Sequence, residues 1–357
     1  MERSSQRRTG EAAAAALVTA EALTRFTKAV FVRAGMSEAH AGIVADVLVW
    51  ADLRGVSSHG VARIPLYARL IDRGDLNVTP AMTTRTETVA SILVEADRAA
   101  GPVAMTSAMD AAMRKARDAG VGLAFVRATT HTAALGYYTS RAADGGLAGI
   151  ALAATTPLMA YHGARAAGVG TSPMSIAVPG GDRGPVVFDM GMGIISMGKL
   201  VQARKTSQPI PAGLALDGAG NPATDSHSAR IPLPVGGPKG SGLALMIECL
   251  TSLVVSNPIL AEALEGTAEG RRHRQNGLAV AVDVARFGDP GAFRRQVDRL
   301  VATLKALPRD PDVPEILVPG ERGRRTLEQR RRDGIPIPRV TFDELRVVAE
   351  RLRVTMV

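Results

Sequence analysis

Short apolar strands alternate with amphipathic helices in the middle of the chain, and this alternation limits the fold more than any other feature. The periodicity predicts strands over 90–95, 121–127 and 147–154, and helices over 102–118 and 133–143. The connections between these segments are short, as in α/β units. Further strands are expected over 174–179, 185–190 and 278–283. We therefore expect an α/β domain over residues 86–289.

Helical patterns dominate both ends of the chain. Apolar residues recur at helical spacing over 19–33 and 37–54, with Ser37 as the expected cap of the second helix, and again over 290–307 and 342–352. Between these ends, Met105 and Met109 are expected in the core of the helix 102–118, and the Pro- and Gly-rich segment 208–238 is expected to be a loop. A chain of 357 residues is long enough for two domains. We expect a helical unit built from residues 1–85 and 290–357, beside the α/β domain.

Composition and charge exclude several classes of protein. No apolar run reaches the ~20 residues of a membrane helix. Glu11 and the shortness of the apolar patch that follows it argue against a signal peptide. Cys249 is the only cysteine, so no intrachain disulfide is possible and a cytoplasmic location is expected. The net charge is +9, but the basic residues are mixed with acids and lack interleaved aromatic residues, so neither a nucleic acid nor a membrane is expected as a partner.

The segment ADLRGVSSHGVAR holds the densest group of candidate catalytic residues. Ser57 or Ser58 is expected to cap a helix that starts near Ser58, which places His59 at a positive helix end and favours its neutral form. Arg63, four residues later, would share the face of His59. A neutral histidine can move a proton while an arginine grips a carboxylate. A surface histidine beside a solvated arginine is the alternative interpretation.

Three glycine-rich segments are candidates for binding phosphate. Gly191-Met192-Gly193 follows a strand but lacks the third glycine and the later acid of a dinucleotide fingerprint, so we reject a Rossmann site there. Residues 168–173 could line a dinucleotide or form a plain turn. Residues 236–242 start a helix with exposed N–H groups and Lys239, which favours an anion site.

Isolated polar residues in apolar surroundings are the remaining candidates. His131 follows the strand 121–127, where sites form in α/β units. Asp189 ends another strand and could cap a helix or partner a histidine. Glu248 lies in an apolar helix and must be paired or exposed. No histidine or cysteine spacing indicates a metal site.

Taken together, these segments resemble the malate/L-lactate dehydrogenase family, which has a sulfolactate dehydrogenase-like fold and includes ureidoglycolate dehydrogenase, diketogulonate reductase and Δ1-piperideine-2-carboxylate reductase. The motifs lie in order from Ala51 to Gly334: ADLRGVSSHGVAR, GVGTSPMSIAVP, VVFDMGMGIISMGK, PIPAGLALDGAGNPATD, GGPKGSGLALMIE, FGDPGAFRRQVD, EILVPGE and RDGIPIP. The resemblance implies a homodimer that binds NADH or NADPH on a fold that is not a Rossmann domain.

The resemblance also implies roles for individual residues. His59 would donate the proton, Ser58 and Arg63 would line the substrate, Asp189 would lie near the nicotinamide, and His131 is the alternative acid or base. The cofactor segments would be Thr171, Ser172, Pro173, Lys239, Gly240, Gly320 and Glu321.

The chain departs from the family pattern at 128–133, 189–193 and 271–278, which points to an unusual substrate or a lost one. The expected function is an NAD(P)-dependent oxidoreductase that interconverts a 2-oxo acid and a 2-hydroxy acid, or reduces a cyclic imino acid. The alternatives are a biosynthetic ketone or imine reductase with a non-standard substrate, and a cofactor-binding pseudoenzyme.

Overall fold

The computed structural model describes residues 14–357, which divide into two compact units. Unit 1 takes both ends of the chain, up to Arg69 and from Gly323, and unit 2 is Leu70–Arg322. Residues 70–85 and 290–322, expected in the terminal helical unit, thus fall in unit 2. The Asn77 N–H donates to the Arg98 carbonyl, and the Asp298 carboxylate accepts from Gly181 N at 3.2 Å. Such contacts between distant segments cannot be read from helical periodicity.

Unit 2 is built on a seven-stranded sheet in the order β2-β3-β4-β13-β5-β8-β9. Only β3 and β4 pair in parallel, and every other neighbouring pair is antiparallel. The strands are β2 (Thr83–Glu87), β3 (Ser91–Glu95), β4 (Val121–Thr129), β5 (Leu147–Ala154), β8 (Met174–Val178), β9 (Val186–Met190) and β13 (Gln275–Asp283). β9 is an antiparallel edge strand, which agrees with the rejection of a Rossmann unit at Gly191.

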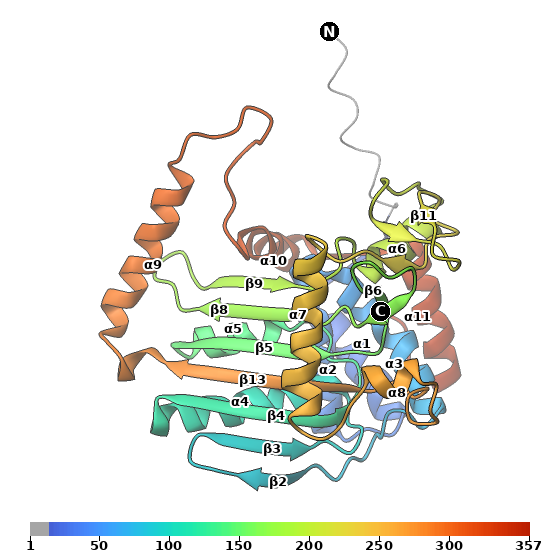
Figure 1. The fold of residues 1–357 in the computed structure, drawn as a ribbon, viewed down its shortest axis with the longest axis horizontal. Helices are drawn as coiled ribbons and strands as arrows, with labels where there is room; N and C mark the ends of the chain where they lie inside the picture. The colour runs from blue at the N-terminus through green and yellow to red at the C-terminus, as the bar shows by residue number, and fades with distance from the viewer. Residues whose placement is uncertain (1–13) are drawn as a thin grey trace. The chain divides into compact units, whose positions relative to one another are not determined.

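Helices cover both faces of this sheet (Figure 1). α4 (Gly101–Ala119) and α5 (Gly136–Asp144) pack on one face, and α7 (Pro238–Glu248), continued by the π-turn η3 (Cys249–Leu253), crosses the other. The sequence predicted these helices to within a few residues, apart from the change to π geometry after Glu248.

Two glycines allow α4 to lie close against the sheet. A Cβ at Gly122 would lie 2.0 Å from the Ala112 carbonyl oxygen, and one at Gly277 would lie 2.4 Å from the Met105 sulfur. Met105 and Met109 are fully buried. The methionine stripe of this helix is therefore core, as its spacing predicted.

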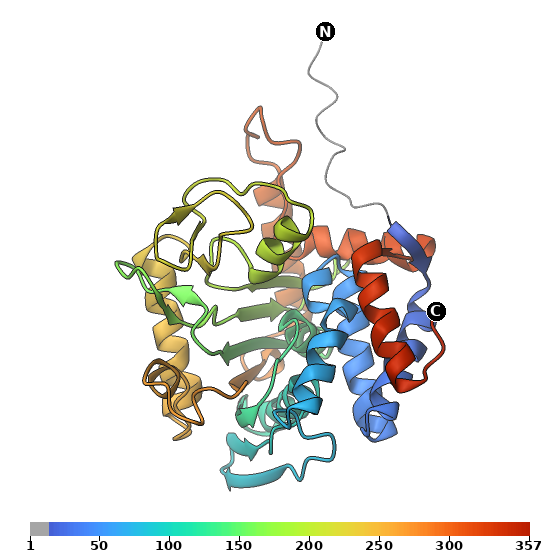
Figure 2. The same ribbon diagram turned by 90° about the vertical axis from the view of Figure 1, so that its right-hand side faces the viewer.

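Unit 1 is mainly helical. Figure 2 shows α11 in red beside the blue N-terminal helices, with which it packs through α1. As expected, the Ser37 hydroxyl caps α2 by accepting from the His40 N–H at 3.2 Å. The elements are β1 (Ala14–Val18), α1 (Ala20–Arg33), α2 (Glu38–Leu53), η1 (Ser57–His59), η2 (Val61–Arg63), α3 (Ile64–Asp72), α10 (Glu321–Asp333), β14 (Ile335–Pro338) and α11 (Arg339–Leu352); α3 and α10 cross the unit boundaries.

The remaining elements of unit 2 are short, apart from α9. They are β6 (Met159–Ala160), β7 (Ala167–Val169), α6 (Met197–Lys205), β10 (Ala215–Leu216), β11 (Pro222–Ala223), β12 (Ile231–Pro232), α8 (Leu260–Leu264), η4 (Val284–Arg286) and α9 (Pro290–Lys305). The long segment 208–238, expected to be a loop, holds the small sheet β11-β10-β12. Within residues 14–357, no helix is both long and apolar enough to cross a membrane.

Candidate active site: two clusters of polar residues

The SSHG segment forms two consecutive 3-10 turns rather than the start of an α-helix. η1 and η2 meet at Gly60, whose extended backbone (ψ −151°) interrupts the helical path, and α3 begins only at Ile64. The expected N-cap at Ser57 or Ser58 is therefore wrong. The Asp52 carboxylate takes the expected role of the serine: it accepts from the Val61 N–H at 2.7 Å. This hydrogen bond attaches the turn to α2.

His59 is held in an orientation suited to proton transfer. The Ser58 hydroxyl is hydrogen-bonded to His59 Nδ1 at 3.0 Å. Desolvation by the surrounding protein, and then the charge of Arg63, lowers the pKa of His59 to about 4, although part of the ring remains exposed. The ring is thus neutral at pH 7, as the sequence predicted, but the main cause is burial and not a helix end.

Arg63 lies beside this histidine on the same pair of turns. Its Nε donates to the Ser58 carbonyl oxygen, which fixes the guanidinium close to the residue that orients His59. Burial lowers the pKa of Arg63, but the group remains charged at neutral pH. Burial also raises the pKa of Tyr67, which keeps this phenol protonated. A fixed cation therefore adjoins a neutral imidazole, which is the combination proposed from the sequence.

Asp52 is a site residue that the sequence analysis missed. Its side chain is buried, and burial raises its pKa to about 6, partly offset by hydrogen bonds from Val61 and Ser57 and by the charge of Arg330. An acid inside the otherwise apolar run VLVWADL was the available signal, because a buried carboxylate must have partners. Here its partners are in the turn that carries His59.

The loop that carries His131 follows the central strand β4, at the end of the unit 2 sheet where β13 begins. The Ala133 N–H donates to His131 Nδ1 at 3.3 Å, which in the neutral ring places the proton on Nε2. Ala128 and Ala133 both have positive φ, of 57° and 55°, an uncommon conformation for alanine that is often found at functional sites. The Gln275 side-chain oxygen accepts from both the Thr132 N–H and its hydroxyl at 3.1 Å.

A buried polar network holds the same loop from the other side. Asn276 Oδ1 accepts from the Ala128 N–H at 2.9 Å, and its Nδ2 donates to the Ser252 hydroxyl at 3.0 Å. The Ser252 hydroxyl donates to Glu248, whose other oxygen accepts from the Ile259 N–H at 2.8 Å. Glu248 is thus paired, as its position in an apolar helix required. The network connects the end of α7 to the His131 loop.

Asp189 connects strand β9 to the helix that follows this loop. Its carboxylate accepts from the Gly136 N–H at 2.8 Å, at the positive N-terminus of α5. Of the two roles considered for Asp189, the structure shows the helix cap. His131 and Asp189 therefore lie at the two ends of the short segment 131–136.

Two of the three expected cofactor segments, 171–173 and 239–240, meet at Met192. The Met192 N–H donates to the Thr171 carbonyl at 2.8 Å, and the Met192 carbonyl accepts from Val235 N at 2.8 Å. A Cβ at Gly240 would lie 3.0 Å from that same carbonyl oxygen. Ser172, next to Thr171 and Pro173, is buried with φ 31°. The end of β9, the turn before β8 and the start of α7 thus meet at Met192.

The start of α7 has the features of an anion site. Gly236 and Gly237 both have positive φ, Pro238 occupies the first turn, and Lys239 is exposed. The first N–H groups of a helix have no intrahelical partner and attract negative charge. His162 Nδ1 would lie 3.2 Å from a Cβ at Gly237, so this histidine adjoins the same loop.

The third expected segment, Gly320–Glu321, lies along the edge strand β9. A Cβ at Gly320 would lie 2.9 Å from the Val187 carbonyl oxygen, so only glycine permits this approach. Glu321 is buried, and both its carboxylate oxygens accept from Lys305 Nζ at 2.8 Å. The Glu321 side chain therefore holds its own segment in place through Lys305. Gly320 and Glu321 would contact a cofactor through their backbone groups.

The polar residues thus gather in two places. Ser58, His59 and Arg63 lie together in unit 1, and His131, Asp189 and the cofactor segments lie in unit 2. Among residues 14–357, no three histidine, cysteine or acidic side chains are grouped so that they could hold a metal ion.

The contact between Gly60 and Asp52 gives a direct test of the turn. A Cβ at Gly60 would lie 2.2 Å from Asp52 Cγ, so we expect Gly60→Ala to displace the turn and to lower the free energy of unfolding by roughly 1–3 kcal/mol. Gly42, in α2, has no heavy atom within 4 Å of its would-be Cβ, so Gly42→Ala should instead stabilise by about 0.5–1 kcal/mol. Urea denaturation of both variants measures the difference, and equal effects would contradict the packing described here.

Comparison with known proteins identifies the family. The profile of the family described as malate/L-lactate dehydrogenase matches residues 18–346. The chain is 33% identical over 325 residues to the malate/(S)-sulfolactate dehydrogenase of Methanothermus fervidus, covering 90% of this chain and 94% of that protein. It is 31% identical over 307 residues to the ureidoglycolate dehydrogenase (NAD(+)) of Escherichia coli O157:H7, covering 85% and 87%.

The fold leads to the same family. The solved sulfolactate dehydrogenase of Methanocaldococcus jannaschii superposes with a TM-score of 0.84 at 32% identity, covering 95% of this chain and 98% of that one. The sulfolactate dehydrogenase-like fold expected from the motifs is thereby confirmed. With sequence and fold in agreement along nearly the whole chain, the protein belongs to the malate/L-lactate dehydrogenase family and is an oxidoreductase.

Proposed function

We propose that the protein is an NAD(P)-dependent dehydrogenase that interconverts a 2-oxo acid and the corresponding 2-hydroxy acid. The observation that carries this proposal is the pair of His59 and Arg63: a neutral imidazole oriented by Ser58, beside a fixed guanidinium. The two groups match the two ends of a 2-hydroxy acid, whose hydroxyl must lose a proton and whose carboxylate needs a cation.

The residues of unit 2 fit a nicotinamide dinucleotide. The start of α7, with Lys239 and Gly240, would hold the pyrophosphate, and the turn at Thr171, Ser172 and Pro173 would lie along the rest of the molecule, because both segments contact Met192. The backbone at Gly320–Glu321 would extend this surface along β9. When bound, the cofactor supplies or accepts the hydride.

In this proposal His59 acts on the proton. In oxidation its neutral ring takes the hydroxyl proton of the substrate, and in reduction the protonated ring returns it to the carbonyl oxygen. A low pKa suits the first role, because the base is then free of its proton at neutral pH. Arg63 holds the substrate carboxylate, and Ser58 sets the orientation of the ring.

His131 is the alternative acid or base. Its loop is held by Gln275 and Asn276, and its Nε2 carries the proton in the neutral ring. Asp189 holds the start of α5 next to this loop, and we propose that it affects catalysis through that position.

Reduction of a cyclic imino acid would need the same two groups and stays an alternative within the enzyme class, as does a biosynthetic ketone or imine reductase. A cofactor-binding pseudoenzyme is the alternative outside it. Activity on a panel of 2-hydroxy acids and cyclic amino acids distinguishes these. A cytoplasmic location, expected from the single cysteine, also stays a prediction.

The surface of α7 supports the expected homodimer. Leu243, Met246, Leu250 and Leu253 are 47%, 52%, 45% and 51% exposed, and their spacing of three and four residues places them along one side of α7 and η3. A continuous exposed apolar stripe of this kind is typical of a protein interface. We propose that a second copy of the chain covers it.

Cofactor binding can be measured without any assumption about the substrate. We expect NADH or NADPH to bind in the presence of a chelator, because the candidate site offers backbone N–H groups and Lys239 and needs no metal. Fluorescence titration with each cofactor measures this, and Lys239→Gln should weaken it. If neither cofactor binds the wild-type protein, the oxidoreductase assignment fails for this chain.

The two histidines can be separated by substitution. We expect His59→Asn to lower kcat by roughly 100-fold or more with cofactor affinity nearly unchanged, because a general acid or base typically contributes ~10²–10⁴ in rate. His131→Asn should act less on kcat and more on KM, and His227→Asn, at an exposed loop position, serves as the control. Since the pKa of His59 is about 4, kcat/KM for oxidation should fall only below about pH 5. Normal turnover of His59→Asn with an inactive His131→Asn would reverse the assignment.

The dimer has its own test. Placing charge on the stripe, in the double variant Met246→Glu/Leu250→Glu, should shift the mass measured by light scattering from dimer to monomer at micromolar concentration, because two buried carboxylates would oppose association. Val89→Glu changes an apolar residue that is 80% exposed in the β2–β3 turn and should leave the mass unchanged. A wild-type monomer would refute the proposal.

A further inference from the structure

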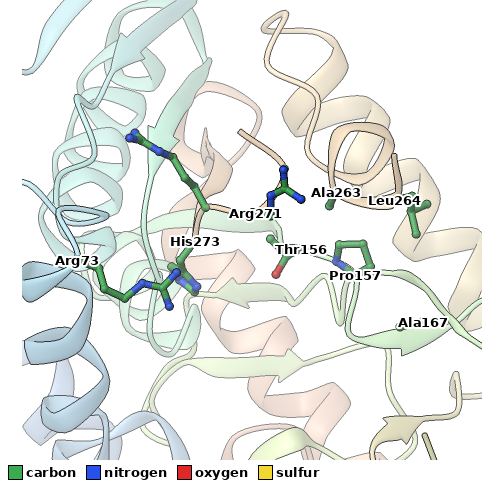
Figure 3. A pocket seen from close by; sticks show the side chains of 10 residues that line it. Arg73, Thr156, Pro157, Ala167, Ala263, Leu264, Arg271 and His273 are labelled. Atoms are coloured by element: carbon green, nitrogen blue, oxygen red, sulfur yellow. The ribbon is translucent and has the colours of Figure 1, made fainter. Parts of the chain in front are cut away.

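A cavity of about 510 Å³ opens at the end of the unit 2 sheet where β13 begins. Thr156 and His273 line it, and Figure 3 shows both side chains. Thr156 comes just after β5 and His273 just before β13, whose first residues pair with the last residues of both β5 and β4. The His131 loop follows β4. A small molecule that enters the cavity therefore reaches the end of the sheet from which this loop starts.

Asn276, the second residue of β13, is fully buried beneath this end of the sheet. Its Oδ1 accepts from the Ala128 N–H at 2.9 Å and from Asn257 Nδ2 at 2.7 Å. Its Nδ2 donates to the Ser252 hydroxyl at 3.0 Å and to the Asn257 carbonyl oxygen at 2.8 Å. A side-chain amide can accept two hydrogen bonds and donate two. All four are used here, so the orientation of the Asn276 side chain is fixed.

The hydrogen bond from Ala128 to Asn276 acts where the backbone is strained. Ala128 has φ 57°, in the left-handed region that alanine rarely adopts. Because Asn276 binds the N–H of this same residue, it opposes relaxation of Ala128 to an extended conformation. Ala128 precedes His131 by three residues, so a change in its φ would redirect the chain that carries the imidazole. The Asn276 side chain thus controls a backbone angle on which the position of His131 depends.

The first turn of α4 packs against the same loop. A Cβ at Gly101 would lie 2.2 Å from the His131 carbonyl oxygen and 2.5 Å from Thr132 Cα. The Thr130 hydroxyl donates to the Ala99 carbonyl oxygen at 3.1 Å, just before this helix. The loop therefore has little room to move toward α4, and Asn276 is the contact that holds its beginning against β13.

We propose that Asn276 is a positioning residue for the reaction: through the backbone of Ala128 it sets where the His131 imidazole meets the substrate. This assignment rests on the dehydrogenase function proposed above. Asn276 acts only through the loop and touches neither substrate nor cofactor. Ser252 and Asn257 have a part in the same role, because they hold the amide in the one orientation that presents Oδ1 to Ala128.

A double-mutant cycle tests whether Asn276 acts through His131. At saturating cofactor, Asn276→Ala should raise KM for a 2-oxo acid roughly fivefold and change kcat less than about twofold, and it should have no further effect on KM in the His131→Asn background, because residues that act as a unit are not additive. Thr251→Val is the control: its hydroxyl donates to the Ile247 carbonyl oxygen at 2.7 Å, so this variant loses a buried hydrogen bond within the helix and should leave KM unchanged. Equal increases of KM in both backgrounds would overturn the proposal.

Glycine at position 128 gives a rescue that a merely structural role of Asn276 would not produce. Glycine adopts a positive φ without strain, so Ala128→Gly should bring the KM of Asn276→Ala at least about twofold back toward the wild-type value. No recovery would contradict the role of this hydrogen bond. If Asn276→Ala does not fold, Asn257→Ala removes the second hydrogen bond to the same Oδ1 and leaves the one from Ala128 in place. Its smaller rise in KM must likewise vanish in the His131→Asn background.

Hydrogen exchange separates an error in the geometry from an error in the function. The peptide covering 128–134 should exchange faster in Asn276→Ala and at the wild-type rate in Thr251→Val. Equal exchange in all three proteins would overturn the positioning role. If the wild-type protein binds neither NADH nor NADPH and reduces no 2-oxo acid, the proposed function fails, and the positioning role fails with it whatever the exchange shows. If the enzyme turns over normally and the cycle is additive, the dehydrogenase stands and the positioning role does not.

Discussion

The antiparallel strand β13, paired with both β4 and β5, determines where the polar groups of unit 2 meet. Because its direction is reversed, its first residues lie beside the last residues of both neighbours. Gln275 and Asn276 thereby reach the loop after β4 and hold it through Thr132 and Ala128. The loop and the network to Glu248 therefore both depend on the pairing of β13 with its two neighbours.

The positive φ values in this region have a similar origin. Ala128 and Ala133 adopt backbone conformations that cost free energy, and the hydrogen bonds from their loop to Gln275 and Asn276 offset that cost. Ser172 also has a positive φ. It lies in the turn before β8, next to Thr171, whose carbonyl oxygen accepts from the Met192 N–H. Part of the backbone strain in unit 2 thus lies in the segments assigned to catalysis and cofactor binding, where a fixed backbone positions groups before the ligand arrives. Asp97, Arg98, Ser207 and Ser256 have positive φ outside these segments.

The sequence predicted features that depend on local periodicity or on the free-energy cost of burying a polar group. It predicted the Ser37 cap, the methionine core of α4 and the neutral state of His59. It could not predict which distant segments meet. Three features join residues whose proximity is not reflected in any periodic pattern of the sequence. They are the strand order, the contacts that place 70–85 and 290–322 in unit 2, and the hydrogen bond from Val61 to Asp52.

Asp52 and His59 also show how the pH dependences of stability of two titratable groups on one turn can largely cancel. The pKa of Asp52 is about 6 when folded against 3.8 in a free chain, so its contribution to stability falls as the pH rises between these values. The pKa of His59 is about 4 against 6.5, so its contribution falls as the pH drops through nearly the same range. Since the two shifts are of similar size and opposite sign, they largely cancel between pH 4 and 6. The turn can therefore hold a histidine that is neutral at pH 7 while this pair of groups adds little net pH dependence to stability between pH 4 and 6.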